Sequence, residues 1–79
     1  MKKIQIKKII ELYFFKILKK KINNKTKIIS NELIDSLGTI ELINFIEKEF
    51  KIHLKENDLT IKKLDTIDSI SNLIFGKIK

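Results

Sequence analysis

Cysteine and proline are absent from this 79-residue chain, and glycine and histidine are rare. Without cysteine the chain can form neither disulfides nor zinc–thiolate sites, and it has no nucleophilic thiol of its own. His53 is the only histidine, so we expect a loop residue without a role and no metal site. The lack of proline, with glycine only at Gly38 and Gly76, favours helices joined by short polar loops.

Long hydrophobic runs are also missing. The longest run near the start is Leu12–Phe15, closed by Glu11 and Lys16, which is far too short for a signal core or a membrane span. We therefore expect a soluble, cytoplasmic protein with no transmembrane segment. Residues 1–79 suffice for one domain, and a core this small leaves little room for a deep catalytic site. The size favours a binding or carrying role over an enzyme.

Charge is unevenly distributed along the chain, whose net charge is +7. Residues 1–30 contain ten lysines and a single acid, Glu11. Residues 31–58 contain seven acids and three lysines, and residues 59–79 contain four lysines and two aspartates. An acidic segment in the middle of a basic protein is not expected of a uniformly basic nucleic-acid binder.

Apolar residues at three- and four-residue spacing predict a first helix over about 2–21, with Lys19, Lys20 and Lys21 in its last turn. Its expected buried stripe consists of Ile6, Ile9, Ile10, Tyr13, Phe14, Ile17 and Leu18. A polar connection over 22–30 follows, with Ile28 and Ile29 as its anchors to the core. The five phenylalanines are expected in the core: Phe14, Phe15, Phe45, Phe50 and Phe75.

Three further helices are predicted. The second begins at Asp35-Ser36, two residue types that favour helix N-caps, and runs to about Phe50. A weak pattern over 56–63 indicates a short third helix, after a segment 51–55 that tucks Ile52 and Leu54 inward. The last helix should start near Asp65-Thr66 and fray at Gly76. Two buried stripes are expected, one of Leu42, Ile43, Ile46 and Phe50 and one of Ile67, Ile70, Leu73, Ile74 and Ile78. The sum is an all-α, four-helix domain.

A short motif carries the functional interpretation. Residues 33–37 read Leu-Ile-Asp-Ser-Leu, and an apolar and acidic stretch follows over 39–50. This arrangement resembles the attachment motif and second helix of the acyl carrier protein family, and Thr66-Ile67 followed by Ile70 is similar to the start of that family's last helix. The resemblance implies a small bundle with a long loop between helices 1 and 2 and a short third helix.

The resemblance implies that Ser36 receives 4′-phosphopantetheine from coenzyme A, with Asp35 helping the modifying enzyme to recognise the site. It implies a carrier of acyl or aminoacyl thioesters that is not itself an enzyme. The expected partners are a phosphopantetheinyl transferase, a cargo-loading ligase or acyltransferase, and a downstream synthase or transferase. The residues that would meet them lie on the second helix: Leu37, Ile40, Glu41, Asn44 and Glu47.

Several positions depart from the usual pattern of the family. Typical members are strongly acidic, whereas this chain is basic, with Lys48 where an acid is common and Asn44 in place of an apolar residue. Gly38 stands where fatty-acid carriers often have aspartate. The motif is closest to D-alanyl carriers and other specialised stand-alone carriers.

One alternative is a basic helical module that binds nucleic acid or anionic membrane through its first helix. Another is a carrier-like subunit whose Ser36 stays unmodified.

Overall fold

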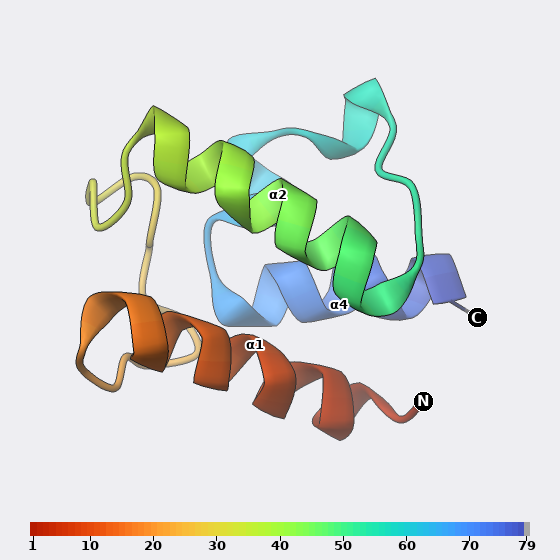
Figure 1. The fold of residues 1–79 in the computed structure, drawn as a ribbon, viewed down its shortest axis with the longest axis horizontal. Helices are drawn as coiled ribbons and strands as arrows, with labels where there is room; N and C mark the ends of the chain where they lie inside the picture. The colour runs from red at the N-terminus through yellow and green to blue at the C-terminus, as the bar shows by residue number, and fades with distance from the viewer. Residues whose placement is uncertain (79) are drawn as a thin grey trace.

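Helices are the only regular secondary structure in residues 1–78, the part of the chain that the computed structural model describes. The elements in chain order are α1 (Lys3–Leu18), α2 (Ser36–Phe50), the 3-10 turn η1 (Glu56–Asp58), α3 (Ile61–Leu64) and α4 (Ile67–Ile78). Helix α4 contacts each of the other three α-helices, with α1 on one side and α2 on the other (Figure 1). The prediction of an all-α bundle is confirmed.

Helix α1 buries Ile6, Ile10 and Phe14, which follow one another at intervals of four. The helix is shorter than predicted, because Lys19 adopts a left-handed backbone (φ 61°) and donates its N–H to the carbonyl of Phe15 at 2.9 Å. This is an αL helix ending in which the residue after the helix satisfies one of the last carbonyls. The prediction of three lysines in the last turn is therefore wrong, and only Lys16 lies there.

Two residues predicted to be buried are largely exposed. Phe15 keeps 52% of its surface in solvent and Ile17 keeps 45%. A helix that packs along one side buries a single stripe, and here positions 6, 10 and 14 form it. Phe15 is one residue beyond that stripe, so its side chain points away from the core. Tyr13 is half-buried and stacks on Phe45 of α2, with ring centroids 4.2 Å apart.

Helices α2 and α4 supply most of the remaining core. The fully or nearly fully buried residues of α2 are Leu42, Ile46 and Phe50, and those of α4 are Ile67, Ile70, Ser71 and Ile74. The predicted anchor Ile28 is fully buried, and Leu54 and Leu64 complete the cluster. Gly76 lies inside α4 in open space, and the helix continues to Ile78. Fraying at Gly76 was a wrong prediction.

The region predicted as one third helix is divided into two pieces. Leu59 leaves the helical region (ψ 63°), and Thr60 is extended. The Thr60 side chain then caps α3 by accepting the N–H of Lys63 at 3.3 Å. A threonine that serves as N-cap must adopt non-helical backbone angles, so it ends the preceding turn as it starts the next.

Helix α4 starts at Ile67, directly after the predicted Asp65-Thr66 pair. Thr66 precedes it, and its hydroxyl accepts the Ser69 N–H at 3.0 Å while the Ser69 hydroxyl accepts the Thr66 N–H at 3.1 Å. This reciprocal pair satisfies two backbone donors at the helix start. Asp65, predicted as part of the cap, has another role, described below.

No helix in residues 1–78 is long and apolar enough to cross a membrane.

Candidate functional site at the start of helix α2

The first turn of α2 is fixed by Asp35. Its backbone is extended, and its carboxylate accepts the Gly38 N–H at 2.8 Å. Its carbonyl accepts both the N–H of Thr39, at 2.9 Å, and the Thr39 hydroxyl, at 3.0 Å. A side-chain oxygen that bonds the third helical N–H is the usual N-cap geometry. The helix therefore begins at a defined residue.

Ser36 is the first residue of α2, and it is exposed. Sequence reasoning allowed either Asp35 or Ser36 to be the cap; the structure gives that role to Asp35. Within residues 1–78 the Ser36 hydroxyl has no hydrogen-bond partner. It is thus held on a fixed backbone but left free to react with a group that comes from solvent.

Gly38 fits closely beneath the cap. A Cβ atom placed there would lie 3.0 Å from the Cβ of Ile34 and 3.3 Å from the Asp35 carboxylate. Contacts of that length are tighter than ordinary van der Waals separations, so a larger residue would push against the chain that leads into the helix. In the sequence Gly38 stands out only as a departure from a family pattern, and nothing there indicates this packing role.

The segment before the site is attached to the start of α4. The Asp65 carboxylate accepts the N–H groups of Ile29, at 2.7 Å, and Ser30, at 2.9 Å, and also the Ser30 hydroxyl. The Asp65 carbonyl accepts the N–H of Ile28 at 2.7 Å. Ile28 in turn accepts the N–H of Leu33 at 2.9 Å, which closes the turn. These bonds hold the approach to Ser36 against the core.

Asp65 is 6% exposed, and its pKa reflects two opposed effects. Burial raises the pKa of the carboxyl, but the hydrogen bonds from Ser30 and Ile29 and the charge of Lys27 outweigh it, and the pKa is lowered below its usual value. Hydrogen bonds to the charged form favour ionisation. Asp65 is therefore a buried carboxylate that stays charged and orders the loop.

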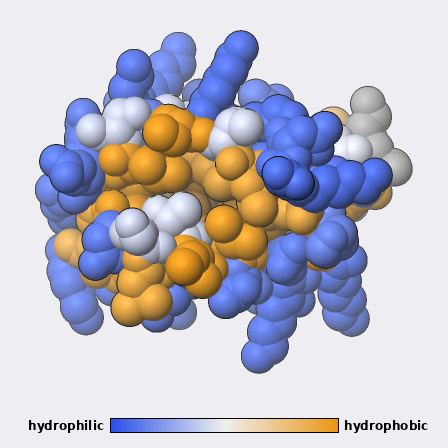
Figure 2. Space-filling model, turned by 90° about the horizontal axis from the view of Figure 1, so that it is seen from above, coloured by the Kyte–Doolittle hydropathy of each residue, from blue (hydrophilic) through white to orange (hydrophobic). Residues whose placement is uncertain are grey.

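Apolar surface surrounds the site. Leu37 is 64% exposed and Ile40 is 55% exposed, both on the outer side of α2. Leu59, which lies just before the Thr60 cap, and Ile61, the first residue of α3, are also exposed. Figure 2 shows the face that includes α2 and the η1–α3 segment, with apolar surface in its middle and hydrophilic side chains around it. Patches of this kind on small proteins mark contact surfaces for partners.

The structure separates the acids predicted to meet partners. Glu41 and Asn44 are exposed beside Leu37 and Ile40. Burial raises the pKa of Tyr13, and the negative charge of the nearby Glu41 raises it further. Glu47, in contrast, is half-buried.

Glu47 is engaged in holding the chain that leaves α2. Its carboxylate accepts the N–H of Leu54 at 2.9 Å and lies 3.3 Å from the Nδ1 of His53. His53, expected to have no role, thus lies in contact with an acid. These bonds hold the return segment so that Leu54, 4% exposed, enters the core. The alternation of Ile52 and Leu54 in the sequence predicts that this segment turns inward, but it does not indicate that Glu47 holds it.

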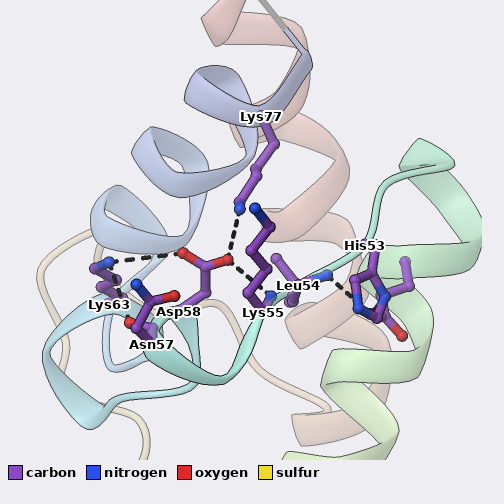
Figure 3. A network of polar contacts seen from close by, with 8 residues as sticks. His53, Leu54, Lys55, Asn57, Asp58, Lys63 and Lys77 are labelled. Atoms are coloured by element: carbon purple, nitrogen blue, oxygen red, sulfur yellow. Dashed lines mark hydrogen bonds and ion pairs between the residues drawn. The ribbon is translucent and has the colours of Figure 1, made fainter.

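A second buried carboxylate ties the η1 turn to α4 (Figure 3). Asp58 lies 2.6 Å from the Nζ of Lys77 and 3.6 Å from that of Lys63, and it accepts the backbone N–H of Lys55 at 2.9 Å. The hydrogen bond from Lys77 is the main cause that lowers the pKa of Asp58, followed by that from Lys55. This network fixes the segment that carries Leu59, and sequence reasoning did not find it.

No group of three or more potential metal ligands occurs in residues 1–78. Comparison of the chain with family models, with curated proteins and with solved structures finds no match. These comparisons assign no family to the chain. The chain is a small all-α bundle that presents an unpaired serine hydroxyl at the start of a helix, beside exposed apolar side chains.

Proposed function

We propose that this protein is a carrier that bears 4′-phosphopantetheine on Ser36 and presents acyl or aminoacyl groups to partner enzymes. The observation that carries the proposal is the free, exposed hydroxyl of Ser36 at the first position of α2, directly after the capping Asp35. The motif resemblance over residues 33–50 supports the same assignment. By this proposal the bundle is of acyl-carrier type, with 19–35 as its long loop and α3 as its short third helix.

The position suits attachment better than catalysis. Ser36 has no histidine or second hydroxyl hydrogen-bonded to it within residues 1–78, so nothing there would activate it as a nucleophile. In attachment the transferase supplies the base that takes the hydroxyl proton. The Ser36 oxygen forms the new bond to phosphorus, the pyrophosphate linkage of coenzyme A breaks, and adenosine 3′,5′-bisphosphate leaves.

The residues around Ser36 fit the group. No side chain covers the hydroxyl, and the attached phosphate would lie beside a helix N-terminus, where the helix dipole favours an anion. Once attached, the group would supply the thiol that a chain without cysteine lacks, and cargo would be held there as a thioester. The protein's own part is to place the attachment point rigidly and to leave it accessible.

The exposed residues Leu37, Ile40, Glu41 and Asn44 form the proposed contact surface for the transferase, the loading enzyme and the downstream enzyme. Such encounters are transient, so steering by exposed acids would act mainly on the rate of association. Glu47 is left out of this surface, because its carboxylate already holds Leu54. Specialised aminoacyl or acyl cargo and a cytoplasmic location are parts of the same proposal.

The direct test is the intact mass of the protein after incubation with coenzyme A and a broad-specificity phosphopantetheinyl transferase. The expected result is a gain of one phosphopantetheine that is lost in Ser36→Ala and kept in Thr60→Ala, which removes another exposed hydroxyl next to a helix start. No gain with several transferases would refute the carrier function and would favour a carrier-like subunit with an unmodified serine.

The contact surface has its own test. Glu41→Lys should slow modification several-fold at low salt, whereas Glu49→Lys, which changes the charge equally on an exposed part of the same helix, should have a smaller effect. Equal rates for the two variants at low salt would remove Glu41 from the proposed surface. Reversal of Glu47 is avoided because it would break the bond to Leu54.

A further inference from the structure

The outward side of α1 carries exposed apolar residues that the bundle does not use. Ile4 is 61% exposed, Leu12 53% and Phe15 52%. The buried stripe of the same helix is Ile6, Ile10 and Phe14. Since each residue turns the helix by about 100 degrees, positions 4, 8, 12 and 15 follow one ridge on the opposite side. We call this ridge, with Lys16 beside it and Lys19 directly after the helix, the outer α1 face.

Lysines alternate with the apolar residues on the outer α1 face. Lys8, Lys16 and Lys19 are exposed, and none of them lies within ion-pair distance of an acid in residues 1–78. Lys7 differs, because it points to α4 and pairs with Asp68 at 2.8 Å. Glu11, the one acid of α1, lies beside Leu12 and Phe15 on the same side but forms no ion pair with these lysines. Positive charge therefore remains in excess on this face.

The position of this face sets it apart from the attachment site. In Figure 1, α1 forms the lower side of the molecule, while the start of α2 and the η1 turn lie on the upper side. The apolar surface of Figure 2 belongs to that upper side. A large partner could cover α1 and leave Ser36 accessible.

We propose that the outer α1 face docks the protein on an anionic lipid surface. Ile4, Leu12 and Phe15 would enter the boundary between headgroups and acyl chains, and the interspersed lysines would meet the lipid phosphates. This is the chemistry of helices that lie in the plane of a membrane interface, which need apolar and cationic side chains together. A nucleic-acid backbone would neutralise the lysines, but it would leave the apolar residues in water.

The kind of docking follows from the way α1 is packed in the bundle. The helix is already packed on α4 by its other side, so it lies flat on the surface and does not insert across it. The apolar contribution is small, so the lysines are needed as well, and binding is reversible and salt-dependent. The docking is independent of the carrier function, because it involves no atom of Ser36.

The test is co-sedimentation of the full, unmodified chain with vesicles of phosphatidylcholine, with and without phosphatidylglycerol as a third of the lipid. We expect the protein to sediment only with the anionic vesicles, and raised salt to release it. Absence of sedimentation with anionic vesicles at low salt would overturn the proposal. Ser36→Ala should bind like the wild type, so failure of the carrier function would not alter this result.

Charge variants identify the surface. Lys8→Gln with Lys16→Gln should weaken binding on the order of 20-fold, at about fivefold for each lysine near an anionic surface. The matched control is Lys48→Gln with Lys62→Gln, which removes two exposed lysines outside α1 and gives the same net charge. An equal loss in both pairs would mean that overall charge, not the outer α1 face, drives binding.

Apolar variants separate a membrane from other anionic partners. Leu12→Ser with Phe15→Ser should reduce vesicle binding at least several-fold. Leu37→Ser with Ile40→Ser, which changes residues on α2 that are at least as exposed, should leave it unchanged. Circular dichroism checks that each variant keeps its helices. If a short DNA duplex retains the protein more tightly than the vesicles, with the same dependence on Lys8 and Lys16, the face binds nucleic acid and the lipid proposal is wrong.

Discussion

Replacing Asp65 by asparagine tests how the approach to Ser36 is held. The carboxylate accepts three hydrogen bonds, from the N–H groups of Ile29 and Ser30 and from the Ser30 hydroxyl. Asparagine retains one acceptor oxygen but no charge. Hydrogen bonds to an ionised group are about 1 kcal/mol stronger than neutral ones. Three weakened bonds should thus lower the free energy of unfolding by about 2 to 3 kcal/mol at neutral pH.

This loss can be measured by urea or thermal unfolding, followed by circular dichroism. For a domain of this size, 1 kcal/mol corresponds to roughly 4–8 °C in Tm, so Asp65→Asn should lower Tm by about 10 to 20 °C. The control is Asp68→Asn, which breaks a half-exposed ion pair with Lys7 and should cost no more than about 1 kcal/mol. A loss from Asp65→Asn no larger than the control would refute the assigned role.

The pH dependence gives a second measure of the same carboxylate. The pKa of Asp65 is lowered in the folded protein, so its contribution is present above the unfolded pKa of about 3.9. As the pH falls towards the folded pKa, protonation removes that contribution. The stability difference between wild type and Asp65→Asn should therefore shrink below about pH 4. A difference that stays constant down to the acid limit would contradict the reasoning.

Three other variants have definite expected outcomes. Ser71→Ala should raise the free energy of unfolding by about 1 kcal/mol in urea titrations, because the Ser71 hydroxyl is fully buried without a partner in residues 1–78; a destabilised variant would reveal a bond that the structure lacks. Gly38→Ala should destabilise by about 1 kcal/mol, although alanine favours helices, because its Cβ would press on Ile34; a gain in Tm would show that the cap can yield. Glu47→Gln should speed hydrogen exchange of the Leu54 amide, which the carboxylate accepts at 2.9 Å; unchanged exchange would show that the bond does not limit opening of that segment.

The structural features that the sequence predicts correctly are set by residues close together in the chain. Helix α2 follows from an aspartate that can cap and an apolar stripe behind it, and both its start and its end at Phe50 agree with the prediction. The anchoring of Ile28 and Leu54 likewise follows from isolated apolar residues in polar segments. Local patterns of this kind act over one or two helical turns, where backbone geometry alone fixes the relative positions of side chains.

The features that sequence missed depend on residues far apart in the chain. Asp65 holds Ser30, 35 residues earlier, and Asp58 is paired with Lys77 from the last helix. An aspartate before a helix looks the same in the sequence whether it caps that helix or accepts hydrogen bonds from a distant loop. Helix-capping propensity therefore cannot distinguish these two roles. The exposure of Phe15 was missed for a related reason, since an apolar stripe does not show how wide the partner surface is.

The central position of α4 has a consequence for the way the chain reaches its fold. Helix α1 is synthesised before α4, the helix against which it packs, and α2, η1 and α3 lie between them in the chain. The core residues Ile6, Ile10 and Phe14 therefore lack the covering surface of α4 until that helix has left the ribosome. Contacts between elements so far apart in sequence also slow the search for the native state. We expect the folding of this small helical protein to be a late and all-or-none event, completed only when α4 docks.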